Sequence, residues 1–215
     1  MTAPRTGDRT TDPFTSLHEA RALLADDLAG LADAQWRSPS LCAGLTVRDV
    51  VAHLTAGASL TFPRWFAMLA RARFDADRMV ARQVTDHLGT DPADTLARFR
   101  AVVTSTTVPS RRHLDAWLGE VLVHGEDVRR PLGLTGPEEV AAWERVARFY
   151  VGHDFTVRSR TLASGLRLEA TDGPFRHGDG PLVRGTTRAL VMALAGRRAY
   201  LDELDGDGVA VLASR

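Results

Sequence analysis

The segment LGEVLVHGEDVRRPLG, residues 118–133, decides the fold and holds the first candidate site residues. We expect a helix over about 111–130, which the ending Pro131-Leu-Gly133 stops. Glu120 and His124 lie four residues apart, and a helix brings side chains at that spacing onto one face. A carboxylate and an imidazole therefore point the same way.

A second segment far upstream, TVRDVVAHL at residues 46–54, predicts another amphipathic helix. Thr46 is its N-cap, and His53 lies on its apolar side. If the two helices pack face to face, two imidazoles and one carboxylate converge. Three ligands with a fourth position free are what a catalytic divalent metal such as zinc needs, so we predict a metal site at His53, Glu120 and His124.

Each of these residues also has an ordinary structural explanation. A lone histidine on an apolar helix face is more often a core or rim residue than a ligand. A glutamate and a histidine four residues apart also occur by accident on helix surfaces. The three residues taken together, on two helical segments that can pack face to face, favour a metal site.

Helical periodicity dominates the first three-quarters of the chain. We expect one amphipathic helix over 14–36, a bend or break of the second helix near Pro63, and a polar, irregular, exposed connection over 71–90. A further helix follows Asp91-Pro92, where aspartate caps and proline takes the first helical position. Another begins after Gly136-Pro137.

The pattern changes near residue 160. Residues 165–170 alternate as a strand does, one helix falls within 185–196, and 204–212 read as a turn into a final short strand. These elements predict a mainly α protein, a helical bundle with a small α+β appendage. We divide the chain into a flexible N-terminus at 1–12, a metal-binding helical bundle at 13–158 and a small α+β domain at 159–215.

Composition bounds the function. The chain has 27 basic and 27 acidic residues, so nothing indicates a nucleic-acid partner, and we look for a small-molecule function. No apolar stretch approaches the roughly 20 residues of a membrane span, and the N-terminus lacks the apolar core of a signal peptide. The single cysteine, Cys42, excludes an internal disulfide framework. We therefore expect a cytoplasmic protein with no membrane partner.

The chain has no lysine, asparagine or isoleucine, so all 27 basic residues are arginine. The codons of these three amino acids begin with two A/T bases and are scarce in very GC-rich genomes, which indicates a high-GC bacterium. Because the same bias explains the arginine excess, we do not interpret the arginines as a binding signal.

Three parts of the chain, in this order, resemble the mycothiol-dependent maleylpyruvate isomerase family, within the wider DinB/YfiT-like metalloenzymes. SPSLCAGLTVRDVVAHL at 38–54 is similar to the family's opening signature, and LVHGEDVRRPLG at 122–133 is similar to its fourth-helix stretch. HGDGPLVRG at 177–185, with LAGR at 194–197 and DGDG at 205–208, resembles the small C-terminal domain of its members, which looks like the sterol-carrier type.

The resemblance implies a DinB-type four-helix bundle that binds a divalent ion, usually zinc, through His53, Glu120 and His124. It also implies thiol chemistry with mycothiol, whose coordinated thiol is deprotonated and becomes a nucleophile for an electrophilic small molecule. The thiol either adds to a conjugated double bond and leaves after rotation, as in an isomerase, or stays on the product, as in a transferase. The three ligands do not distinguish these outcomes, nor a monomer from a homodimer. Leu45 departs from the family pattern, since relatives commonly carry tryptophan there; the exchange concerns a pocket wall and leaves the ligands intact.

Two further residues are candidates for catalytic support. Asp127, three residues after His124, is placed to accept the free ring N–H of a ligand histidine; a capping or salt-bridged aspartate is the alternative. Arg197 is a candidate to hold a substrate carboxylate by a bidentate pair, against the alternative of a solvated surface arginine. We expect Cys42 to be a small buried residue and not the nucleophile, because nothing near it clearly supplies a base.

Two other functional classes remain open. A metal-activated water in place of a thiol would make the protein a metal-dependent hydrolase, and turnover would then not need mycothiol. A non-catalytic small-molecule binding protein on the same fold is the other class. Weak metal retention, or no loss of function when Glu120 is changed to alanine, would favour it.

Overall fold

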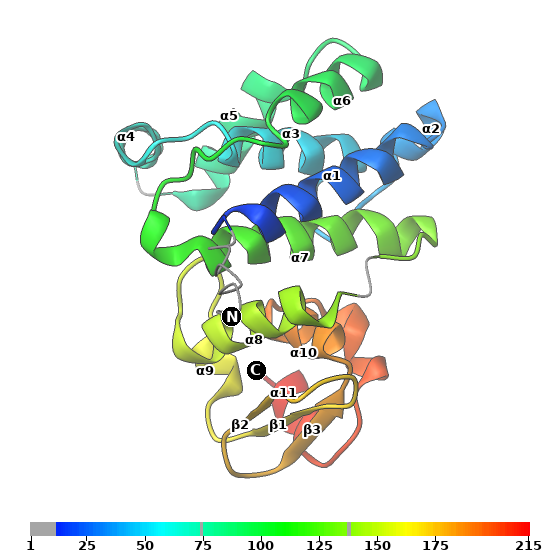
Figure 1. Cartoon of the computed structure of the whole chain (residues 1–215), viewed down its shortest axis with the longest axis vertical. Coiled ribbons are helices and arrows are strands. Elements are labelled where there is room, and N and C mark those ends of the chain that lie inside the picture. Colours follow the sequence, from blue (N-terminus) through cyan, green and yellow to red (C-terminus); the bar gives the residue numbers. More distant parts are fainter. Residues whose placement is uncertain (1–11, 74, 137–138) are drawn as a thin grey trace, which may run out of the picture.

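The computed structural model describes residues 12–73, 75–136 and 139–215 (Figure 1). The described chain is mainly helical, with a small three-stranded sheet near the C-terminus. The helical elements are α1 (Thr15–Ala29), α2 (Asp33–Trp36), α3 (Val47–Gly57), α4 (Phe62–Arg71), α5 (Ala76–His87), α6 (Pro92–Ala101), η1 (Arg111–His113), α7 (Leu114–Leu132), α8 (Val140–Gly152), α9 (Ser159–Ala163), α10 (Thr187–Leu194), η2 (Arg198–Glu203) and α11 (Gly208–Ala213).

Four helices form a closed ring of contacts around one core. α7 packs against both α1 and α3, and α6 packs against the same two helices. α5 covers the outer side of α3, and α8 packs on α7 (Figure 1). The expected face-to-face packing of the two helices that hold the candidate ligands, α3 and α7, is therefore confirmed.

The start of α3 is fixed by its first residues. The Thr46 Oγ1 accepts a hydrogen bond from the Asp49 backbone N–H at 3.3 Å, and the Asp49 carboxylate accepts one from the Thr46 backbone N–H at 2.9 Å. This reciprocal pair satisfies two N–H groups that a helix start leaves unpaired. The predicted N-cap is thus confirmed, and it sets the rotation at which α3 presents His53.

α7 is the longest helix of the described chain, and it continues two residues beyond the expected end at 130. Pro131 lies in its last turn, and Gly133 then adopts the left-handed conformation with φ 67°. The N–H groups of Gly133 and Leu134 donate back to the carbonyls of Arg130 and Arg129, which closes the helix end. The helix therefore ends at Gly133 as predicted, because a glycine adopts the positive φ of this end at little energetic cost.

A second glycine sets how closely two helices approach. A Cβ at Gly119 of α7 would lie 3.1 Å from the Tyr150 hydroxyl oxygen and 3.1 Å from a Val146 methyl group, both on α8. The absence of a side chain at Gly119 therefore lets α8 lie directly on α7, one residue from Glu120.

Three expectations about the secondary structure are wrong. The connection expected over 71–90 contains α5, because Gln83 and Val84 are buried where α5 packs on α3. The single helix expected over 14–36 breaks near Gly30 into α1 and α2. The final strand expected over 204–212 is instead α11, and a single bridge between Arg184 and Asp205 is its only sheet-like part within the described residues.

The C-terminal part is a mixed sheet covered by helices. Its strands are β1 (Arg167–Ala170), β2 (Arg176–His177) and β3 (Leu182–Gly185), in the order β2-β1-β3. β1 pairs with β2 antiparallel and with β3 parallel. α10 packs on β1, on β3 and on α8, so buried side chains form one core from the bundle into the sheet. The proposed division into 13–158 and 159–215 stays a prediction, and the N-terminus expected at 1–12 lies, except for Asp12, outside the described residues.

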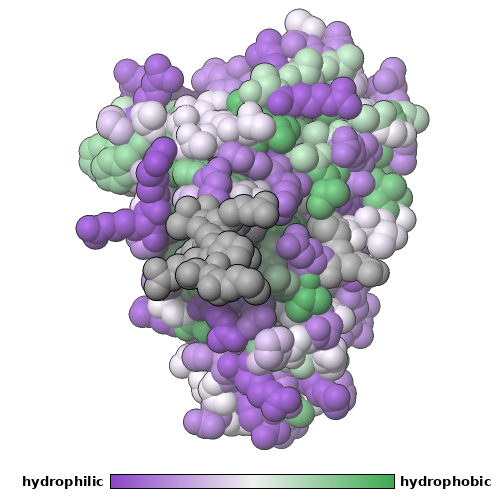
Figure 2. Space-filling view, viewed as in Figure 1, coloured by the Kyte–Doolittle hydropathy of each residue, from purple (hydrophilic) through white to green (hydrophobic). Residues whose placement is uncertain are grey.

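The surface in Figure 2 is mostly hydrophilic, with a hydrophobic patch over α4. None of the ten residues of α4 is buried, and Phe62 and Phe66 are 56% and 51% exposed. Among elements with substantial contacts, α4 touches only α5. No described helix is long and apolar enough to cross a membrane.

Candidate metal centre

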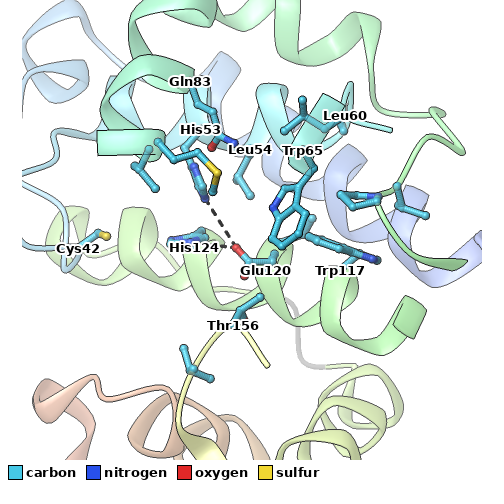
Figure 3. A pocket seen from close by; sticks show the side chains of 18 of the residues that line it. Cys42, His53, Leu54, Leu60, Trp65, Gln83, Trp117, Glu120, His124 and Thr156 are labelled. Atoms are coloured by element: carbon cyan, nitrogen blue, oxygen red, sulfur yellow. Dashed lines mark ion pairs between the residues drawn. The ribbon is translucent and has the colours of Figure 1, made fainter. Parts of the chain in front are cut away.

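Helices α3 and α7 bring the three predicted ligands together. His53 comes from α3, and Glu120 and His124 from α7 (Figure 3). The Glu120 Oε2 lies 3.3 Å from the His124 Nε2 and 3.7 Å from the His53 Nε2. One donor atom from each residue lies within 4.8 Å of the others.

The donor set and its spacing fit a zinc-like ion. Two imidazole nitrogens and one carboxylate oxygen form a ligand set of catalytic zinc sites. Tetrahedral ligands at about 2.1 Å from an ion lie about 3.4 Å from each other, close to the spacings from Glu120 to the two histidines. In the described chain, the ion-pair partners of Glu120 are the two histidines alone.

Charge at the centre favours a cation. Burial opposes ionisation of Glu120, but hydrogen bonds and charge from His124 and His53 hold the pKa of its carboxyl well below the usual range. Burial alone would lower the pKa of His124; the flanking carboxylates of Asp127 and Glu120 outweigh it and raise that pKa to about 9. A ligand histidine must be neutral, so an ion and this proton compete for the same place.

Asp127 orients His124. Its side chain is fully buried, and its Oδ2 accepts the His124 Nδ1–H at 2.9 Å. Because an ionised carboxylate only accepts hydrogen bonds, the neutral His124 ring that an ion requires keeps its proton on Nδ1 and presents Nε2 to the centre. Despite burial, the hydrogen bonds from His124 and Arg197 lower the pKa of Asp127.

Arg197 holds Asp127 from the opposite side. Its Nε donates to Oδ1 at 3.0 Å and its Nη2 to Oδ2 at 2.6 Å, a bidentate pair. Its Nη1 donates to the Ala195 carbonyl oxygen at 2.7 Å. Arg197 also lines the cavity described below. The carboxylate that it holds in this structure belongs to Asp127, and contact with a substrate carboxylate stays a prediction.

The arginines next to Asp127 in sequence have other partners. Arg129 donates to Asp27 at 2.6 Å, and Arg130 pairs with Glu203. The geometry therefore favours the orienting role of Asp127 over a salt bridge to these neighbours.

A cavity of about 450 Å³ opens onto the three residues. Its walls are largely apolar, and α3, α4, α5 and α7 contribute to them, together with the segment after α8. The large apolar side chains that line it are Leu54, Leu60, Trp65, Leu69, Met79, Val80, Trp117, Val121, Phe155 and Val157.

Three polar or reactive residues line the cavity although the sequence did not predict them there: Cys42, Arg21 and Gln83. Cys42 has a donor atom within 4.8 Å of those of His124 and Asp127, so the expectation that no base lies near it is wrong. Burial and the charges of Asp127 and Glu120 nevertheless raise the pKa of its thiol, although Arg197 acts in the opposite direction. Cys42 is therefore held as a thiol.

Arg21 of α1 is 3% exposed and also lines the cavity. Its Nη1 donates to the Ser105 carbonyl oxygen at 2.8 Å and to that of Val102 at 3.4 Å, just beyond the end of α6. Burial lowers its pKa to about 10. Arg21 therefore holds the segment that follows α6 against α1 while it forms part of the wall.

Gln83 of α5 was missed because residues 71–90 read as a loop. A usable signal was present: the Asp75 side chain accepts a hydrogen bond from the Arg78 backbone N–H at 3.0 Å, as an N-cap does. An aspartate followed by apolar residues at helical spacing would have predicted α5.

Comparison with known proteins finds one matching family model and two structures of similar fold. Residues 17–111 match the family model described as the mycothiol maleylpyruvate isomerase N-terminal domain. A search of curated proteins found no match. The fold matches the crystal structure of the mycothiol-dependent maleylpyruvate isomerase with a TM-score of 0.61 at 17% identity. It matches a histidine-to-alanine mutant of that protein with a TM-score of 0.62 at 16% identity, and each match covers 91% of both chains. At these identities the structural likeness establishes the fold alone.

Proposed function

We propose that this chain, whose residues 17–111 form a mycothiol maleylpyruvate isomerase N-terminal domain, is a zinc-dependent enzyme that directs the thiol of mycothiol onto an electrophilic small molecule. The observation that carries the proposal is the convergence of His53, Glu120 and His124 at one end of an apolar cavity. A bundle of DinB type and a sterol-carrier-like C-terminal part belong to the same proposal.

His53, Glu120 and His124 would hold the ion. When bound, zinc supplies a Lewis acid with a free coordination position, at which a thiol loses its proton near neutral pH. Asp127 keeps the His124 Nδ1 protonated, and Arg197 keeps Asp127 ionised and in place. The chain thus supplies a ligand set whose orientation is fixed before any substrate enters.

The cavity walls limit the electrophile. Trp65, Trp117 and Phe155 present aromatic surface next to the centre, and the other walls are mainly aliphatic. Both arginines of the wall already have partners, Arg21 with main-chain carbonyls and Arg197 with Asp127. We therefore expect an electrophile with an apolar body, which these walls would desolvate, more than a small, doubly charged acid.

The test combines metal content with thiol-dependent turnover. Zinc per chain is measured by elemental mass spectrometry for the wild type, His124→Ala and Glu120→Ala, with the exposed His177→Ala and Glu19→Ala as matched controls. We expect about one zinc per chain in the wild type and controls, and loss of zinc in the two site variants.

Turnover of a panel of apolar electrophiles is then followed with mycothiol, without a thiol and with water alone. Product that retains the sulfur indicates a transferase, and an isomerised product with free thiol indicates an isomerase. Zinc-dependent turnover without thiol would replace the proposal by a hydrolase. A wild-type protein that takes up no zinc would leave a non-catalytic binding protein on this fold.

A further inference from the structure

His53 has only one of its two ring nitrogens facing the proposed metal centre. Its Nε2 faces Glu120, whereas its Nδ1 is buried and has no hydrogen-bond partner among the residues that the structure describes. A neutral imidazole that binds a metal through Nε2 carries its proton on Nδ1. The Nδ1–H of His53 therefore needs an acceptor, as the Nδ1–H of His124 has in Asp127.

Gln83 offers the complementary atom. Its side chain is 3% exposed, and its Oε1 is a buried acceptor that likewise has no partner within the described residues. Gln83 comes from α5, which packs on α3, and both residues line the same cavity. Figure 3 shows the amide end of Gln83 pointing toward the His53 ring.

Burying two polar atoms without partners lowers the stability of the fold, and a hydrogen bond between them removes both penalties at once. One is a donor when the other is an acceptor, and a glutamine side chain has three rotatable bonds with which to adjust. We infer that Gln83 is the positioning residue of His53: its Oε1 accepts the Nδ1–H and so fixes the ring with Nε2 toward the metal. This inference rests on the proposed metal centre.

The inference also gives α5 a role in the site. The fourth helix of the bundle core, α6, contributes no residue to the cavity, whereas α5 supplies Met79, Val80 and Gln83. α5 would then align the α3 ligand in the way that Asp127 aligns the α7 ligand.

Zinc affinity of the purified full-length protein, measured by competition with a chromophoric chelator, tests the inference. We expect Gln83→Leu, which keeps the volume and removes both polar atoms, to weaken zinc binding about 10-fold or more. Gln83→Glu keeps an acceptor and should bind zinc at least as tightly as wild type. Val84→Ala, a buried neighbour on α5 that does not line the cavity, should lower the stability of the metal-free protein with no change in zinc affinity.

A merely structural role for Gln83 predicts a different pattern. Metal-free Gln83→Leu would then unfold at a lower temperature than wild type, with zinc affinity unchanged. Under the inference, metal-free Gln83→Leu unfolds at the wild-type temperature or a higher one, because the structure gives the Oε1 no hydrogen-bond partner among the described residues. Wild-type zinc affinity in Gln83→Leu would overturn the inference and leave the metal centre standing. A wild-type protein that binds no zinc would overturn both.

Nitrogen-15 NMR of the His53 ring gives a second readout, independent of the stability of any variant. In the zinc-loaded wild type we expect a protonated Nδ1 whose hydrogen exchanges slowly with water. A rapidly exchanging Nδ1–H, or zinc on Nδ1, would contradict the role of Gln83 even if Gln83→Leu failed to fold.

Discussion

Asp127 is the residue on which the most interactions of the site depend. It accepts hydrogen bonds from His124 on one side and from Arg197 on the other, and it is fully buried. Such a carboxylate has two separable effects: it orients a ligand, and it neutralises a partly buried cation. Substitutions of Asp127 itself and of Arg197 separate these two effects.

Asp127→Asn is expected to weaken zinc binding at least 10-fold, because an amide orients the His124 ring less firmly than a carboxylate does. It should also lower the free energy of unfolding of the metal-free protein by about 3 kcal/mol, because the cation of Arg197 loses its counter-charge. Chelator competition and urea unfolding measure the two effects. A variant with unchanged zinc affinity would show that Asp127 serves stability alone.

Arg197→Met separates positioning from substrate binding. If Arg197 acts through Asp127, the variant loses zinc affinity as well as turnover, for anionic and neutral electrophiles alike. If Arg197 holds a substrate carboxylate, KM rises for carboxylate-bearing electrophiles only, and zinc affinity stays at the wild-type value. The KM values of a matched acid and its methyl ester, with the zinc affinity, distinguish the two.

At the scale of the elements, the start of α3 and the contact between α7 and α8 hold the ligands in register. The start of α3 depends on the N-cap Thr46, and the contact between α7 and α8 depends on the absence of a side chain at Gly119. Each can be changed without touching a ligand.

Thr46→Ala removes the N-cap hydroxyl of α3 and should lower the free energy of unfolding by about 1–2 kcal/mol. Thr46→Ser keeps the hydroxyl and should stay close to wild type. The urea midpoint of each protein, at an unchanged m-value, gives the comparison. Equal destabilisation by serine would mean that the threonine methyl group, and not the cap, matters.

Gly119→Val should destabilise the protein by about 1–3 kcal/mol, since its Cβ alone would lie 3.1 Å from Val146 and Tyr150. Gly152→Ala, on the partner helix, meets nothing within 4 Å and should be neutral or slightly stabilising. Thermal unfolding of the two variants is the measurement. A neutral Gly119→Val would contradict the close packing of α7 and α8.

At the scale of the whole molecule, the metal centre joins helices that are far apart in the sequence, so an ion should stabilise the fold. Zinc at 100 times its dissociation constant is expected to add about 2.7 kcal/mol to the free energy of unfolding, and a chelator should reverse the shift. His124→Ala should show no such shift. A zinc-induced shift of equal size in that variant would place the bound ion elsewhere.

The sequence predicts what depends on short-range pattern. The spacing of Glu120 and His124, the cap at Thr46 and the stop at Gly133 are local features, and each leads to a correct statement about the fold. Family resemblance added the expected zinc, which the donor geometry supports.

What the sequence misses depends on tertiary contacts. Residues 76–87 are polar on average, and their helix is stabilised by packing on α3, so α5 and Gln83 were not expected. The final strand expected over 204–212 is wrong for a similar reason: glycines and short apolar runs suit a strand or a helix, and the segment is a helix that packs on β3 with Leu212 buried. The carboxylate that Arg197 holds comes from a residue 70 positions earlier, which no local pattern could identify.

That separation has a consequence for the chain as it leaves the ribosome. The bundle helices and all three proposed ligands are synthesised before Arg197. The carboxylate of Asp127 therefore has no arginine partner until the C-terminal part has been made. A nascent chain stopped before residue 197 would carry the donor atoms without the support that aligns them. The proposed centre would therefore gain its full support only after Arg197 has been synthesised.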